Sequence, residues 1–254
     1  MGHKETVRIV PGAKTAVLFL HGISGSPRHF RELLPLEGLV PQNWSVYNIL
    51  LPGHGGSVKD FGRSRMEAWK GHVQLVLQKL AETHENILIV GHSMGTLFAL
   101  QAAKAMPEKV AGLFLVASPL YIHIRPSIVR DLLLLNFGAP EKDSPVVASI
   151  RRACGIRTTW KLWEYIGWIP RLLELFREIR LTRKLLADRS VPCVAYQSDW
   201  DEFVSNRSGK LLESNGIDVF RLRDSTHFHY TQPDNLTVQK GFLDFVEKYK
   251  KQGE

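Results

Sequence analysis

The pentapeptide Gly91-His92-Ser93-Met94-Gly95 carries the strongest chemical signal in this chain. It has the pattern Gly-x-Ser-x-Gly, and it follows a short apolar run, residues 86–90, and precedes a stretch with helical spacing. Glycines let a strand and a helix approach closely, and the tight turn between them lifts the serine hydroxyl clear of a sheet. We therefore predict that Ser93 is a nucleophile and that the main-chain N–H of Met94 faces a developing oxyanion.

A serine hydroxyl attacks efficiently only when a base takes its proton, and histidine is the usual base. With a nucleophile turn of this kind, the acid and then the histidine follow the serine along the chain. His227 comes shortly after the predicted strand 218–222, and His229 follows it closely. We predict His227 as the base, because it lies nearer the end of the strand, with His229 as its rival.

The acid that orients the base is predicted after the apolar run 191–197. Asp201 is our predicted acid, and Asp199 is the alternative. Both follow the carboxyl end of the same strand, so their spacing alone does not decide between them. Either residue, taken singly, would be an ordinary polar residue of a turn.

Two further glycine-rich turns follow predicted strands. His21-Gly22-Ile23-Ser24-Gly25 comes after the run 16–20, where a turn can direct main-chain N–H groups toward one point. We predict that the N–H of Ile23 is the second oxyanion donor, beside that of Met94. Residues 52–57 form the other turn, and we predict that its His54 is structural.

Short apolar runs alternate with helical patterns over most of the chain, which is typical of a mostly parallel sheet with helices on both faces. Ligands bind such sheets at the carboxyl ends of the strands, where the candidate residues above are found. The predicted strands are 16–20, 44–51, 86–90, 110–117, 191–197 and 218–222, and the predicted helices are 66–84, 92–106, 205–215 and 235–250.

Residues 120–189 interrupt this alternation, with helical patterns at 126–137, 146–153 and 158–186 and no convincing strand. This region holds 13 Lys and Arg against 7 Asp and Glu, and three of the six Trp. We therefore expect a core of residues 1–118 and 191–254 and a helical cap, inserted at 119–190.

The composition excludes collagen-like, disordered and disulfide-scaffold proteins. With 254 residues, 44% hydrophobic side chains and a net charge of +8, the chain is typical of one globular protein without a transmembrane run or a signal peptide. Two cysteines, Cys154 and Cys193, fit free thiols in a reducing, cytoplasmic setting. Neither a metal-binding cluster nor a nucleotide-binding motif is present, so we expect no cofactor. The positive charge comes without any nucleic-acid-binding motif.

On these motifs the chain resembles the α/β-hydrolase superfamily, and within it the branch of monoacylglycerol lipases and small bacterial carboxylesterases. The resemblance implies that fold with a helical lid, and it favours Asp201 over Asp199 because the acid of this branch lies in an Asp-x-x-hydrophobic turn. Residues 197–200 lack the small residue that usually precedes this turn. The matching segments are 21–25, 51–55, 91–95, 201–204 and 225–227.

The chemistry expected is hydrolysis of carboxylic esters through a Ser-His-Asp triad and an acyl-enzyme. Medium-chain acyl esters or monoacylglycerols are the expected small-molecule substrates, and a thioesterase or acyltransferase with the same triad is the alternative. The cap mixes Trp160, Trp163 and Trp168 with basic residues from Arg171 to Lys184. Such a stretch can cover an acyl pocket or make weak contact with an anionic membrane surface.

Overall fold

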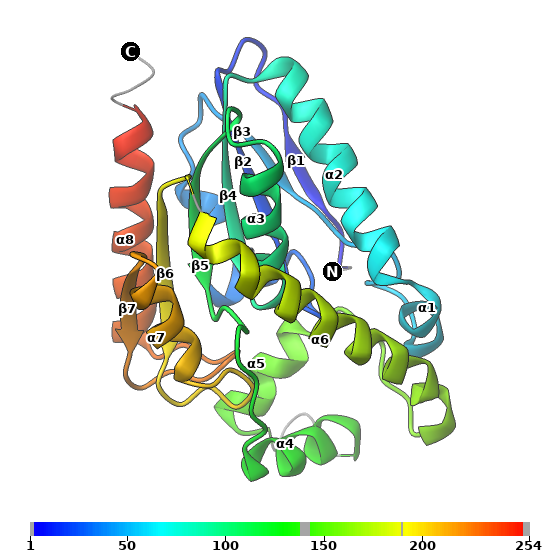
Figure 1. Cartoon of the computed structure of the whole chain (residues 1–254). Coiled ribbons are helices and arrows are strands. Elements are labelled where there is room, and N and C mark those ends of the chain that lie inside the picture. The colour runs from blue at the N-terminus through cyan, green and yellow to red at the C-terminus, as the bar shows by residue number, and fades with distance from the viewer. Residues whose placement is uncertain (1–2, 138–142, 189, 251–254) are drawn as a thin grey trace.

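The structure is a computed structural model that describes residues 3–137, 143–188 and 190–250. Seven strands form one sheet in the order β1-β3-β2-β4-β5-β6-β7 (Figure 1). β1 pairs antiparallel with β3, and the other neighbours are parallel. This is the mostly parallel sheet predicted. The strands are β1 (Thr6–Arg8), β2 (Thr15–Leu20), β3 (Ser45–Asn48), β4 (Asn86–His92), β5 (Val110–Val116), β6 (Cys193–Ser198) and β7 (Asp218–Leu222).

The parallel register brings the carboxyl ends of the strands to one edge. Leu20 of β2 lies opposite Gly91 of β4, and His92 lies opposite Val116 of β5. Ser198 of β6 lies opposite Leu222 of β7 in the same way. The turns that carry the candidate residues therefore start from the same edge, at the lower end of the sheet in Figure 1.

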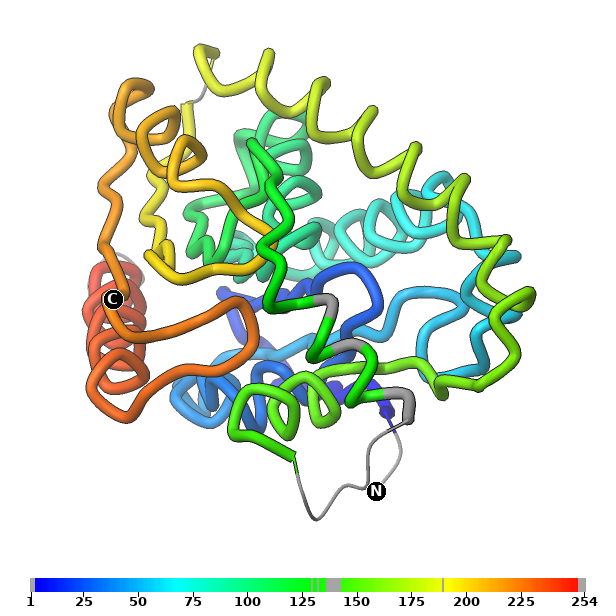
Figure 2. The backbone as a smooth tube through the Cα atoms, turned by 90° about the horizontal axis from the view of Figure 1, so that it is seen from below, coloured from blue at the N-terminus to red at the C-terminus, as the bar shows by residue number. Residues whose placement is uncertain are grey.

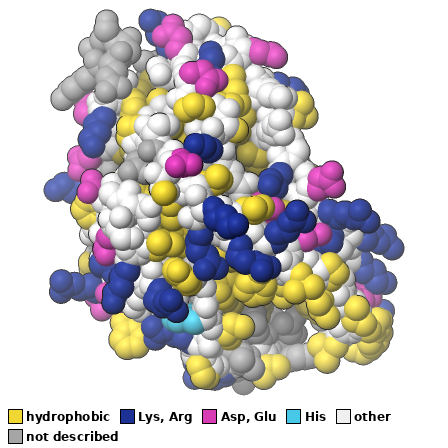
Figure 3. All heavy atoms as spheres, viewed as in Figure 1, with side chains coloured by type: hydrophobic (Ala, Val, Ile, Leu, Met, Phe, Trp, Pro, Cys, Tyr) yellow, Lys and Arg dark blue, Asp and Glu magenta, His cyan; other side chains and the backbone are white. Residues whose placement is uncertain are grey.

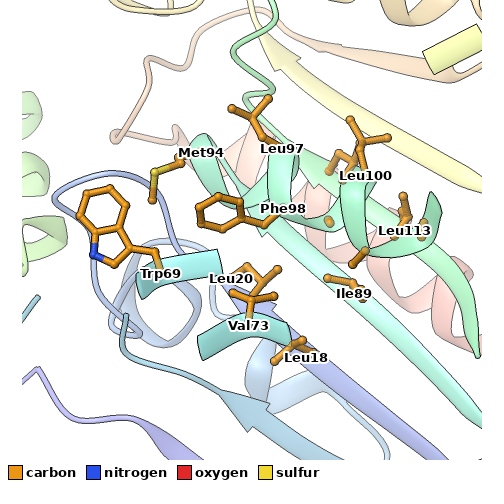
Figure 4. Packing of buried hydrophobic residues seen from close by; sticks show 14 of the residues in the cluster. Leu18, Leu20, Trp69, Val73, Ile89, Met94, Leu97, Phe98, Leu100 and Leu113 are labelled. Carbon is orange, nitrogen blue, oxygen red and sulfur yellow. The ribbon is translucent and has the colours of Figure 1, made fainter. Parts of the chain in front are cut away.

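Helices α2 (Met66–Thr83) and α3 (Met94–Ala105) cover one face of the sheet, together with α7 (Arg207–Ser214). α2 is amphipathic, and its buried residues recur every three or four positions, including Trp69 and Val73. In Figure 4, Trp69 lies on the side of Met94 of α3, and Val73 lies near Leu18 and Leu20 of β2. Burial of each large apolar side chain contributes roughly 1.5–3 kcal/mol to stability.

The opposite face is covered by α8 (Gln232–Lys250) and by η1 (His29–Leu33), a short π-helical turn. Phe242 of α8 packs against Phe19 of β2 and Phe114 of β5, and Phe30 of η1 also contacts Phe19. Because both faces are covered, the central strands are buried on both sides, which explains their continuous apolar sequences.

Helices occupy the stretch between β5 and β6, as the sequence predicts for an insertion. Figure 2 looks at the carboxyl edge of the sheet and shows α6 along one side and α4 and α5 along another. α6 is tied to the core by Arg171, which donates to the carbonyl oxygen of Ser64, and by Glu178, which pairs with Lys70. The insertion contains α4 (Pro126–Phe137), α5 (Pro145–Ala153), the 3₁₀ turns η4 (Leu162–Gly167) and η5 (Leu186–Asp188), and α6 (Trp168–Leu185).

Several elements differ from the sequence-based expectations. The helix predicted over 158–186 is divided into η4 and α6, and the strand predicted over 44–51 is shorter. The short elements β1, η1 and α1 (Val58–Arg63) were not predicted. Within the described ranges, no helix has the length and apolar content that a membrane span requires.

Candidate active site

Ser93 lies in a strained turn between β4 and α3. Its φ and ψ are 52° and −123°, a conformation that costs a non-glycine residue roughly 1–3 kcal/mol. The Ser93 N–H donates to the carbonyl oxygen of Val116 over 2.9 Å. The Ser93 carbonyl oxygen accepts from the N–H and the hydroxyl of Thr96, over 2.9 and 2.7 Å. These bonds hold the serine main chain in place, so the fold itself sets the position of Oγ.

The glycines around Ser93 allow close approach of the main chain. A Cβ on Gly95 would collide with the carbonyl oxygen of Leu20, and one on Gly91 would lie 2.8 Å from the carbonyl carbon of Gly95. A Cβ on Gly22 would lie 2.9 Å from the Cβ of Ser93. The loop after β2 therefore passes directly beside the serine.

His227 and Asp201 meet Ser93 at this edge. The Nε2 atom of His227 lies 3.1 Å from the Oγ of Ser93, and its Nδ1 lies 2.7 Å from the Oδ2 of Asp201. All three side chains are buried. The other carboxylate oxygen of Asp201 accepts the N–H groups of Phe203 and Val204, over 2.8 and 2.7 Å. Because a carboxylate only accepts hydrogen bonds, the bond to Oδ2 of Asp201 requires the proton on Nδ1 of His227. Nε2 is then free to accept a hydrogen bond from the serine hydroxyl.

The alternative residues face other partners. Asp199 pairs with Arg221 over 2.7 Å, and its main-chain N–H continues the ladder by donating to Leu222. His229 lies with its Nδ1 at 3.2 Å from the hydroxyl of Ser149 in α5. His54 is buried beside His21 and the aromatic side chains of α1 and α2, away from the serine. Of the sequence-predicted candidates, the structure thus joins Asp201 and His227 to Ser93.

The two predicted oxyanion donors also lie at this edge. Met94 is the first residue of α3, where main-chain N–H groups have no partner within the helix and the helix dipole favours negative charge. Ile23 belongs to the loop that passes beside Ser93, and the N–H of Gly25 closes that loop by donating to Gly22 over 3.0 Å. Ser24, which directly follows Ile23 in this loop, has a φ of 54°.

Comparison with known proteins identifies the family. The sequence profile described as "Alpha/beta hydrolase family" matches residues 17–238, most of the chain. The chain belongs to the alpha/beta hydrolase family. A thermostable monoacylglycerol lipase of Bacillus sp. (strain H-257) is 23% identical over 245 residues, which cover 92% of this chain and 90% of the relative.

Solved structures of alpha/beta hydrolases share this fold. A metagenome-derived lipolytic enzyme superposes with a TM-score of 0.72 at 23% identity, covering 97% of this chain and 98% of its own. The monoacylglycerol lipase of Paleococcus ferrophilus superposes with a TM-score of 0.67 at 14% identity, covering 95% and 97%. These likenesses establish the fold.

The surroundings of His227 suit a base in this alpha/beta hydrolase. Burial, the largest effect, lowers the pKa of the imidazole, whereas the charge of Asp201, its hydrogen bond and the charge of Glu202 raise it. The net result is a pKa above the ordinary 6.5. Such a shift increases the affinity of the imidazole for a proton, and it moves upward the pH above which the ring is uncharged and can act as a base.

The uncharged rings of two histidines, His92 and His29, pack behind His227. The ring of His92 lies 4.9 Å from that of His227 and stacks on His29 at 3.7 Å. Burial, with a smaller effect of the neighbouring histidines, lowers the pKa of His29 to about 3 and holds that of His92 well below 6.5. These rings are therefore uncharged at neutral pH, and they pack behind His227 without competing for its proton.

The structure also shows polar side chains at the site that the sequence analysis did not single out. The Glu202 carboxylate accepts the main-chain N–H of His227, and the Tyr230 hydroxyl donates to its carbonyl oxygen. No periodic or spaced pattern marks either residue, because each acts on main-chain atoms. Among the described residues, no group of three or more His, Cys, Asp and Glu could hold a metal ion.

Proposed function

We propose that the protein is a serine hydrolase that cleaves carboxylic esters through a Ser93-His227-Asp201 triad and an acyl-enzyme. The observation that carries this proposal is the continuous chain of contacts from Ser93 Oγ through the imidazole to the Asp201 carboxylate. His227 takes the hydroxyl proton as Ser93 Oγ bonds to the ester carbonyl carbon, and it returns that proton to the leaving alcohol. Water, activated by the same imidazole, then releases the carboxylic acid and restores Ser93.

The N–H groups of Ile23 and Met94 are the proposed oxyanion donors. Their support is the position of Met94 at the start of α3 and the close approach of the Gly22 loop to Ser93. Each such donor contributes about 3 kcal/mol to stabilisation of the tetrahedral intermediate in comparable sites.

Medium-chain acyl esters or monoacylglycerols are the proposed substrates. The Bacillus relative is named a monoacylglycerol lipase, and it matches this chain over nearly its full length. We propose that residues 119–190 act as a cap that selects the acyl chain, over a core of residues 1–118 and 191–254. Its α6 carries Leu172 and Phe176, which are large apolar side chains exposed by 43% and 45%.

The cap is also the proposed membrane contact. Six large apolar side chains of η4 and its surroundings are each at least 59% exposed, an unusual concentration for a protein surface in water. Exposed Lys and Arg side chains follow along α6, above the apolar group in Figure 3. This apolar cap patch consists of Trp160, Leu162, Trp163, Ile166, Ile169 and Leu173.

We further propose a reducing, cytoplasmic setting, because the chain has only two cysteines, Cys154 and Cys193, too few for a disulfide framework. Burial raises the pKa of the Cys154 thiol, which keeps it protonated and unreactive at neutral pH.

An ester panel tests the proposed activity. Purified protein is assayed on p-nitrophenyl esters from two to sixteen carbons, on monoacylglycerols and on matched thioesters, with Ser93→Ala as the variant. We expect the highest kcat/KM on medium-chain esters and loss of turnover by at least about 10³-fold in the variant, with its thermal unfolding unchanged. Activity that survives Ser93→Ala would refute the triad, and a preference for thioesters would replace the ester assignment.

A further inference from the structure

The main chain of His227 is held on both sides by buried side chains. Its N–H donates to the Oε2 atom of Glu202 over 2.8 Å. Its carbonyl oxygen lies 3.2 Å from the Nε2 of His92 and accepts from the hydroxyl of Tyr230 over 3.3 Å. Glu202 is only 5% exposed, so this bond is formed away from bulk water.

Residues 201–204, here called the acid turn, thus direct two neighbouring carboxylates, those of Asp201 and Glu202, at His227. Asp201 binds the imidazole, and Glu202 binds the main-chain N–H of the same residue. A carboxylate buried at this depth is costly unless a partner compensates it, and a charge-assisted hydrogen bond to an amide is such a partner. The main-chain N–H of Arg125, at the start of the insertion, donates to the Glu202 carbonyl oxygen over 3.0 Å and fixes the turn from outside.

The groups that face the imidazole come from several elements. Asp201 and Phe203 approach from the acid turn, His92 and Ser93 from the end of β4, and Phe228 from the histidine loop. Tyr230 lies in the same loop, where burial, Asp201 and Glu202 raise the pKa of its phenol well above 10. His92 and His29 are uncharged at neutral pH. The negative charges that raise the pKa of the His227 imidazole are those of Asp201 and Glu202.

We propose that Glu202 is a positioning residue for the base, and that its carboxylate both anchors the His227 main chain and stabilises the imidazolium formed during catalysis. This inference rests on the proposed function, since it assigns a partner to the base of that reaction. Anchoring keeps Nε2 at a fixed distance from Ser93. The charge adds to that of Asp201 in favouring the protonated ring, as the upward shift in the pKa of His227 indicates.

Two substitutions separate anchoring from charge. Glu202→Gln keeps an oxygen that can accept the His227 N–H but removes the negative charge, whereas Glu202→Ala removes both. Asp199→Asn is the matched control, because this carboxylate lies just before the turn and pairs with Arg221. The measurements are kcat and KM from pH 5 to 9 on a soluble p-nitrophenyl ester, together with thermal unfolding.

For Glu202→Gln we expect the acid limb of kcat/KM to move to lower pH by about half a unit or more, because loss of a nearby negative charge lowers the pKa of the imidazole. For Glu202→Ala we expect kcat to fall about ten- to a hundredfold with KM unchanged. The control should keep the profile of the natural protein.

An acid limb that stays in place in Glu202→Gln overturns the proposal, as does a loss in Glu202→Ala that falls on KM alone. If Glu202→Ala does not fold, the profile of Glu202→Gln decides. Labelling of Ser93 in the natural protein by a fluorophosphonate distinguishes the two failures, because it tests the proposed function independently of Glu202.

Discussion

At the scale of single residues, the two aspartates that follow β6 bind different partners. Asp201 is buried and receives the imidazole and two main-chain N–H groups, whereas Asp199 pairs with Arg221 at a partly exposed position. A buried, fully bonded carboxylate holds the tautomer and the orientation of a histidine, and an exposed ion pair contributes little.

Substitution of the two aspartates should therefore have unequal effects. In Asp201→Asn the charge that stabilises the imidazolium is lost and the side-chain amide favours the wrong tautomer, so we expect kcat to fall roughly 10³- to 10⁴-fold. Asp199→Asn should stay within about twofold of the natural protein in kcat, because this carboxylate pairs with Arg221 at a partly exposed position and not with His227. The check is kcat on a p-nitrophenyl ester for both variants, and a larger loss in Asp199→Asn would make Asp199 the acid.

The sequence predicts Ser93 and His227 as partners because each directly follows a strand that ends at the same edge. It does not separate Asp199 from Asp201 by spacing, and only the resemblance to known hydrolases favours Asp201. The structure supplies the missing reason. β6 continues to Ser198, and the ladder includes the N–H of Asp199, so the turn that faces the histidine begins after it. A contact to main-chain atoms, such as that of the Glu202 carboxylate with the N–H of His227, cannot be inferred from residue spacing.

At the scale of elements, the segment between α5 and η4 is hydrogen-bonded to two glycine-rich loops of the core. The N–H of Gly155 donates to the carbonyl oxygen of Ser24 over 2.8 Å, and its own carbonyl oxygen accepts the N–H of Gly55. Ser24 has a positive φ and directly follows Ile23. The insertion thus supports the loop that carries a proposed oxyanion donor.

Gly155→Ala tests this support. The added Cβ would collide with the carbonyl oxygen of Gly25 and lie 2.9 Å from the Cβ of Ser26, so the loop or the insertion must shift. We expect kcat/KM to fall about ten- to a hundredfold, with an equal loss of affinity for a trifluoromethyl ketone that forms a tetrahedral adduct. Gly38→Ala is the control, since its Cβ would meet nothing within 4 Å. Equal activity of the two variants would contradict this role for Gly155.

The long elements were predicted well, and the short ones were not. α2, with 18 residues, matches its predicted range almost residue for residue, because its apolar pattern is long. α1 was missed, although Ser57 and Asp60 form a capping box that marks its start. η4 ends at Gly167, which packs closely against Gly62 of α1. Such a contact between distant segments cannot be inferred from a local pattern.

At the scale of the whole molecule, charge and exposed apolar surface are concentrated in the insertion. Residues 120–189 carry +6 of the net charge of +8, and the same stretch contains the apolar cap patch. The cation at Lys161 lies 5.9 Å from the ring centre of Trp160, within this patch. Tryptophan beside cations suits the boundary between lipid headgroups and acyl chains.

Replacement of Trp160 and Trp163 by alanine should weaken binding to anionic vesicles by at least about tenfold, because each buried aromatic side chain contributes roughly 1.5–3 kcal/mol. Co-sedimentation with phosphatidylcholine vesicles, with and without phosphatidylglycerol, measures this binding, and salt should reduce the contribution of the anionic lipid. Leu236→Ala on α8 is the control, because this exposed leucine lies outside the patch. Turnover of a short, soluble ester should persist in the double variant, since both rings are exposed. Vesicle binding that is equal in all three proteins would show that Trp160 and Trp163 do not contribute to membrane binding.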